Sequence, residues 1–258
     1  MNTSAADVVL LHGVGLDHTM WHRVAPELVA AGHRVHAPDL LGHGTAPDAA
    51  PGTALADLAA PVAGLIAEAD TPVHLVGFSL GALVASRVAL DHPARVASLT
   101  LVSGVANRSE TERRAVAARL EAAHRDLAGA FDAAVDRWFS PRWRNAEPDL
   151  AAAIHDVLRA NRPTSYLACY TVFTAADAEL WPELPRMVPP VLAITGEDDP
   201  GSTPRMAAAV ADRVPRGRWA TVPGARHLLP LERPDAVVAA VLAQIRGLPL
   251  DLPGAMVP

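Results

Sequence analysis

The sequence predicts one α/β domain, in which a mostly parallel sheet of about six strands carries helices on both faces. Short β-rich apolar runs alternate with helical patterns along the chain, and this alternation is typical of parallel sheets. Half of the 258 residues are hydrophobic and only 19% are charged, so the chain can bury a large core. The expected strands are residues 8–11, 34–37, 73–78, 96–102, 191–195 and 218–222.

The alternation is interrupted once, between residues 105 and 190, where helical patterns follow one another without a strand. The first begins with Ser109-Glu110-Thr111-Glu112, a capping-box pattern, and three more cover residues 131–138, 148–160 and 164–173. Three tryptophans and both tyrosines fall in this segment. We therefore expect residues 105–190 to form an inserted helical cap, and residues 1–104 and 191–258 to form the core. The alternative is an ordinary helical subdomain without a pocket.

Composition excludes several classes of protein. The net charge of -6 argues against a nucleic-acid partner, because phosphate binding needs a concentrated basic surface. Cys169 is the only cysteine, and no cluster of Cys, His and carboxylates has ligand spacing, so neither a metal nor a cofactor is expected. No apolar stretch approaches the roughly 20 residues of a membrane helix, and no basic leader opens the chain. We expect a cytoplasmic protein without a membrane partner, and the sequence leaves its oligomeric state open.

The strongest chemical signal is Gly77-Phe78-Ser79-Leu80-Gly81, which joins the expected strand 73–78 to a helix over 82–91. A serine on such a tight strand-to-helix turn is strained, and nothing bulky fits two residues to either side. The turn lifts the hydroxyl clear of the sheet and points the first helical amides, including that of Leu80, at a reacting carbonyl oxygen. Ser79 is therefore the expected nucleophile.

A serine hydroxyl needs a base to accept its proton and an acid to orient that base. Among eleven histidines, His227 lies in a loop just after the sixth strand, at the sheet edge where catalytic loops gather. His12 and His43 lie in glycine-rich turns, where a bracing role is expected, and the others fall on helices or strands. The acid should follow the fifth strand, where residues 197–199 are three successive carboxylates.

These motifs and their order resemble the α/β-hydrolase superfamily of serine hydrolases. The early Leu11-His12-Gly13 extends the likeness over almost the whole chain. The resemblance implies the α/β-hydrolase fold with Asp199 as the acid, since the family's acid stands three residues after a glycine. It also implies that the amide of Val14 is a second oxyanion donor beside that of Leu80. Only seven residues precede the first strand, so we expect six strands where relatives have two more.

Within the superfamily, the chain resembles the 3-oxoadipate enol-lactonase type of carboxylic ester hydrolase. The likeness lies in Arg137-Trp138-Phe139-Ser140-Pro141 and Tyr166-Leu167-Ala168-Cys169 of the cap, and in Leu231-Glu232-Arg233-Pro234. It implies that the chain cleaves a small carboxylic ester or lactone through an acyl-enzyme. By analogy, Arg137 is a candidate for binding a substrate carboxylate. The alternative is an ion pair between Arg137 and Asp136 or another acid of the cap.

The aromatic residues of the cap are too numerous for an exposed surface, so we expect them to line a mainly apolar pocket for a small or medium acyl group. The expected lining residues are Leu16, Arg137, Trp138, Phe139, Trp143, Tyr170, Phe173 and Leu228. Other functions remain open, because the same triad serves carbon–carbon, amide and perhydrolase chemistry. A ligand sensor without enzymatic activity can also keep the fold.

Overall fold

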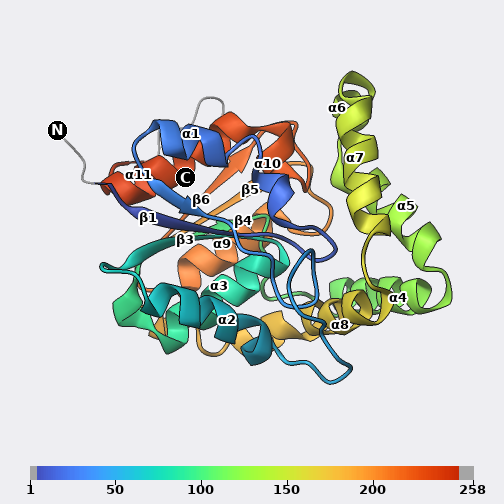
Figure 1. Cartoon of the computed structure of the whole chain (residues 1–258), viewed down its shortest axis with the longest axis horizontal. Helices are drawn as coiled ribbons and strands as arrows, with labels where there is room; N and C mark the ends of the chain where they lie inside the picture. Colours follow the sequence, from blue (N-terminus) through green and yellow to red (C-terminus); the bar gives the residue numbers. More distant parts are fainter. Residues whose placement is uncertain (1–4, 250–258) are drawn as a thin grey trace.

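The computed structural model describes residues 5–249, which form a six-stranded parallel sheet between two layers of helices (Figure 1). The strand order is β2-β1-β3-β4-β5-β6, and every neighbouring pair is parallel. The bounds are β1 (Asp7–Leu11), β2 (Arg34–His36), β3 (Val73–Phe78), β4 (Val96–Val102), β5 (Val191–Gly196) and β6 (Gly217–Val222). The fold prediction is confirmed, and each strand ends within one residue of its expected bounds.

Burial along the strands follows their places in the sheet. β1 and β5 are buried along their whole length, as expected for inner strands covered on both faces. The edge strand β2 is short and exposes Arg34 and His36. A short edge strand with an exposed charge, here that of Arg34, disfavours pairing with another sheet.

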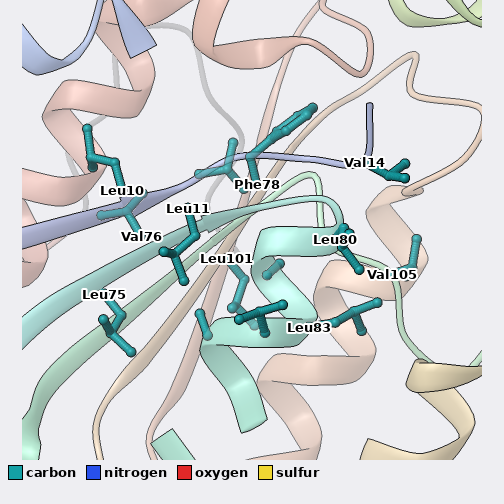
Figure 2. Close-up of a cluster of buried hydrophobic side chains, with 14 of the residues drawn as sticks. Leu10, Leu11, Val14, Leu75, Val76, Phe78, Leu80, Leu83, Leu101 and Val105 are labelled. Atoms are coloured by element: carbon teal, nitrogen blue, oxygen red, sulfur yellow. The ribbon is translucent and has the colours of Figure 1, made fainter. Parts of the chain in front are cut away.

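The helices cover both faces of the sheet (Figure 1). α1 (Ala25–Ala30) and α11 (Pro234–Arg246) lie on one face, and α2 (Leu55–Ala67), α3 (Leu80–Asp91) and α9 (Pro204–Arg213) lie on the other. This division follows from the right-handed connections of parallel sheets, because the chain moves from β1 toward one edge and from β3 toward the opposite edge. The loops after these two neighbouring strands therefore diverge, which is where α/β sheets bind ligands. Figure 2 shows Val14 and Leu80 at this end of the sheet, beyond the buried side chains of β1 and β3.

Between β4 and β5, residues 105–190, all of them described, form the 3-10 helix η3 (Leu184–Arg186) and, before it, five successive α-helices. They are α4 (Glu110–Arg125), α5 (Leu127–Trp138), α6 (Pro141–Ala146), α7 (Pro148–Arg159) and α8 (Pro163–Leu180). α5, α6 and α7 project beyond the carboxyl edge of the sheet (Figure 1). The predicted capping box opens α4: the Ser109 hydroxyl accepts from the amide of Glu112 at 3.3 Å, and the Glu112 carboxylate accepts from the amide of Ser109 at 2.6 Å.

The structure adds one α-helix to the four helices predicted in this segment. α6 has six residues, which are too few for a helical repeat to be recognised in the sequence. Residues 1–4 and 250–258 of the expected core lie outside the described residues. None of the helices in residues 5–249 is long and apolar enough to cross a membrane.

Two glycines let α3 approach the sheet closely at the turn after β3. A Cβ atom on Gly81 would lie 2.2 Å from the carbonyl oxygen of Leu11, and one on Gly77 would lie 2.3 Å from the carbonyl oxygen of Gly81. Both neighbours are backbone atoms, so no side-chain rotation could relieve either clash. The first turn of α3 is therefore held against the end of β1.

Gly81→Ala should lower the free energy of unfolding by about 1–3 kcal/mol, the usual cost of an overpacked site. Urea denaturation followed by circular dichroism would measure the change. Gly64→Ala is the control, because Gly64 is an exposed position of α2 with no atom near the added methyl group. Alanine favours a helix over glycine by about 0.5–1 kcal/mol, so this variant should be as stable as the parent or more stable. Equal stability of the parent and Gly81→Ala would contradict the close approach.

Candidate active site

Ser79 is held in a strained backbone conformation at the turn between β3 and α3. Its φ and ψ are 52° and -110°, in a region that costs a non-glycine residue about 1–3 kcal/mol. Backbone hydrogen bonds hold it there: its N–H donates to the carbonyl oxygen of Val102 at 3.0 Å, and its carbonyl accepts from Ala82 at 3.0 Å. The turn presents Ser79 to a cavity beneath the cap helices.

The imidazole of His227 connects Ser79 to Asp199. Its Nε2 lies 3.3 Å from the Ser79 Oγ, and its Nδ1 lies 2.7 Å from the Asp199 Oδ2. A carboxylate only accepts, so the network assigns the proton to Nδ1 and leaves the Nε2 lone pair facing the serine hydroxyl. This arrangement suits proton transfer from serine to imidazole.

Asp199, rather than Asp198, contacts His227. Its second oxygen, Oδ1, accepts from the amides of Gly201 at 2.8 Å and Ser202 at 2.9 Å, so both oxygens of this buried carboxylate have donors. Asp198 is exposed. Within residues 5–249, no group of three or more His, Cys, Asp or Glu residues is placed to hold a metal ion.

The amides of Val14 and Leu80 have no acceptor within the described part of the chain. Leu80 is the first residue of α3, where helical N–H groups lack partners and the helix dipole favours negative charge. Val14 lines the same cavity as Ser79. The two backbone donors are therefore available to an oxygen atom that develops negative charge beside Ser79.

His12 braces the loop that carries Val14. Burial lowers its pKa to about 4, so the ring is neutral at pH 7. The neutral ring accepts from the amide of Leu40 through Nε2 at 2.8 Å, and its Nδ1–H donates to the carbonyl of Gly13 at 2.9 Å. The ring of His43 lies edge-on to it at 5.1 Å. These contacts agree with the bracing role expected for both histidines.

The cavity at Ser79 has a volume of about 170 Å³. Four of the residues expected in the pocket line it, namely Arg137, Trp138, Tyr170 and Phe173. An engineered cavity of about 150 Å³ binds benzene, so the space suits a small or medium acyl group. We call it the active-site cavity.

Four other expected residues do not line the active-site cavity: Leu16, Phe139, Trp143 and Leu228. Leu16 and Leu228 are buried in the core. The Phe139 ring stacks on that of Trp143, with centroids 4.3 Å apart, so these two aromatics cover each other where α5 meets α6. This part of the pocket prediction was wrong, because an aromatic side chain can be buried by a neighbour as well as by a pocket.

Three arginines line the active-site cavity, and they differ in their partners. Arg108 pairs with Asp177 at 2.7 Å, and both side chains are 3% exposed. Arg119 and Arg137 form no ion pair with any acid in residues 5–249. Burial, and then repulsion from Arg119, lower the pKa of Arg137.

The ion pair considered between Arg137 and Asp136 does not form, since Asp136 pairs with Arg144. Arg119 was not predicted, although the sequence carries a signal for it. It lies three residues after the buried Val116 and four before the buried Ala123, on the inward face of α4.

Comparison with known proteins agrees with this architecture. The model of the alpha/beta hydrolase family matches residues 8–240. The (E)-2-((N-methylformamido)methylene)succinate hydrolase of Acinetobacter baylyi is 28% identical, over 94% of this chain and 91% of its own. The pimeloyl-[acyl-carrier protein] methyl ester esterase of Aeromonas hydrophila is 32% identical, over 91% and 93%.

Among solved structures, the enol-lactonase from Burkholderia xenovorans LB400 has a TM-score of 0.83 and 27% sequence identity. The match covers 94% of this chain and 92% of the enol-lactonase. The family model spans most of the sequence, and one relative is 32% identical over nearly the whole length of both chains. The chain belongs to the α/β-hydrolase family.

Proposed function

We propose that the chain hydrolyses a small carboxylic ester or lactone through an acyl-enzyme on Ser79. The proposal rests on the hydrogen-bond contacts that connect Ser79 to His227 and His227 to Asp199. His227 accepts the serine proton as Oγ attacks the substrate carbonyl, and Asp199 stabilises the imidazolium that forms. His227 then protonates the departing alkoxide. It next activates a water molecule, which releases the acyl group.

In this mechanism the amides of Val14 and Leu80 stabilise the negative oxygen of each tetrahedral intermediate. Preorganised backbone donors act most strongly where charge develops, and loss of one such donor costs about 10²–10³ in kcat. Both amides lack a protein acceptor within residues 5–249, which supports this role.

The names of similar proteins favour an ester or lactone over the other bonds that the triad can cleave. One is named a methyl ester esterase and another an enol-lactonase. Carbon–carbon, amide and perhydrolase chemistry use the same three residues, and a ligand sensor can retain them. Repeated turnover of an ester would separate an enzyme from a sensor.

We further propose that the substrate carries a carboxylate that Arg137 and Arg119 bind. Both guanidinium groups line the active-site cavity without an acidic partner among the described residues. A guanidinium binds a carboxylate through two parallel hydrogen bonds, which fixes orientation as well as charge. A substrate anion would provide the counter-charge that the protein does not.

Ser79→Ala should abolish labelling by a fluorophosphonate and lower kcat by about 10⁴-fold or more, because it removes the only group that forms the acyl-enzyme. Mass spectrometry of the labelled peptide and ester hydrolysis assays would measure both effects. Ser86→Ala is the matched control: this buried serine lies on the same helix and donates to the carbonyl of Ala82. Retention of most activity in Ser79→Ala would exclude the assignment.

Asp199→Asn should lower kcat on the order of 10⁴-fold, since the amide would favour the wrong tautomer of His227. Asp198→Asn changes the same charge one residue away, on an exposed side chain. It should alter kcat by no more than about twofold, as surface substitutions usually do. A larger loss in Asp198→Asn than in Asp199→Asn would reverse the assignment of the acid.

Arg137→Ala and Arg119→Ala should each reduce kcat/KM by about tenfold or more for a monomethyl ester of a dicarboxylic acid, the usual worth of a hydrogen bond to a charged group. A neutral methyl ester of equal chain length should be hydrolysed nearly as before. Arg144→Ala is the control, because Arg144 lies in the cap, pairs with Asp136 and does not line the cavity. Equal losses for acidic and neutral esters would mean that these arginines support the cap and do not bind charge.

A further inference from the structure

The loop that carries His227 is hydrogen-bonded directly to the end of cap helix α5. The carbonyl of Trp138, the last residue of α5, accepts from the amides of His227 at 3.0 Å and Leu228 at 3.2 Å. The guanidinium of Arg226 donates to the carbonyl of Phe139 at 3.3 Å. Hydrogen bonds with the cap therefore help to hold the backbone of His227 in place.

Glu232 connects the cap to the loop that carries His227. It ends the short helix α10 (Leu229–Glu232). Its Oε1 accepts from the amide of Ser140 at 2.5 Å, and its Oε2 accepts from the amide of Arg226 at 2.8 Å. Ser140 is the N-cap of α6 in the cap, and Arg226 immediately precedes His227. One carboxylate thus holds an amide of the cap and an amide of the histidine loop.

The surroundings of Glu232 leave these two amides as its main partners. Within residues 5–249, it forms no ion pair with an arginine or histidine. Burial raises its pKa, which the two amide hydrogen bonds partly oppose. Glu232 is half-buried. A carboxylate that is partly shielded from water is costly unless it is hydrogen-bonded, and these two amides supply donors to both of its oxygens.

We propose that Glu232 is a positioning residue, which sets His227 against Ser79 by fixing the amide of Arg226 to that of Ser140. The choice of a carboxylate has a chemical reason, because it offers two acceptor oxygens and no donor. Glutamine has the same shape but presents an NH₂ group to one of the two amides. The proposal rests on the role of His227 in the proposed function.

The other contacts around His227 leave the amide of Arg226 to Glu232. The Ser103 hydroxyl donates to the carbonyl of His227 at 2.8 Å, and Asp199 orients the ring. The N–H of the peptide that precedes the histidine donates to Trp138, and the carbonyl of Ala225 accepts from the amide of Asp198 at 3.0 Å. Glu232 holds the amide of Arg226, which has no other acceptor in residues 5–249. A misplacement of about 1 Å can slow a reaction by about 100-fold. The Nε2–Oγ distance of 3.3 Å leaves little room for further separation.

The test is the rate of Ser79 labelling by a fluorophosphonate in Glu232→Gln. If a variant unfolds, a smaller fraction of the protein is labelled. If a variant stays folded but His227 is misplaced, the labelled fraction reacts with a lower rate constant. We expect full labelling with a rate constant lower by about 10–100-fold. Glu110→Gln is the control, because it removes the same charge from an exposed side chain of the cap. Its rate constant should equal that of the parent.

Glu232→Met provides a second test in case the amide destabilises the fold, since it fills similar volume without an acceptor. It should also label fully and slowly. A parent-like rate constant in the labelled fraction of either variant would overturn the positioning role. Absence of Ser79 labelling in the parent protein would instead reject the proposed function.

Discussion

The close approach of α3 to the ends of β1 and β3 is the constraint on which the candidate site depends. Gly81 lies against the carbonyl of Leu11, and no side chain beyond hydrogen fits between them. Leu11 is in register with Gly77, so the same contact fixes the end of β1 relative to the start of the turn. Backbone hydrogen bonds with Val102 and Ala82 hold Ser79 in its strained conformation. The loop of Val14 and the first amide of α3 therefore stay together before any substrate binds.

The acidic and the basic side chains of the active-site cavity differ in whether they have partners within the protein. Both oxygens of the buried Asp199 carboxylate are hydrogen-bonded, one by two backbone amides and the other by His227. The positive charges of Arg119 and Arg137 have no acid opposite them in the described residues. Both side chains are half-buried. Charged groups that are partly shielded from water and lack partners are costly, so proteins retain them where a ligand supplies the compensation. This contrast is the physical basis for proposing an anionic substrate.

Local patterns in the sequence predict the strands, the serine turn and the place of the histidine loop, because each depends on neighbouring residues. The choice of Asp199 over Asp198 came from the family resemblance, and it agrees with the observed contact. The pocket was predicted only in part. The number of aromatic residues in the cap predicts that Phe139 and Trp143 line a pocket, and it does not indicate that their rings stack on each other. The Glu232–Ser140 contact joins residues 92 positions apart, and no periodicity relates them.

The cap contributes to the candidate site in two ways, through residues that are adjacent in the sequence. Arg137 lines the active-site cavity, and the carbonyl of Trp138 accepts from the amide of His227. Glu232 holds the next turn of the cap, at Ser140, to the residue before the histidine. In the proposed reaction, a carboxylate bound by Arg137 would therefore hold the same end of α5 that supports the general base. Binding energy from a part of the substrate that does not react would then help to keep His227 at the distance that proton transfer requires.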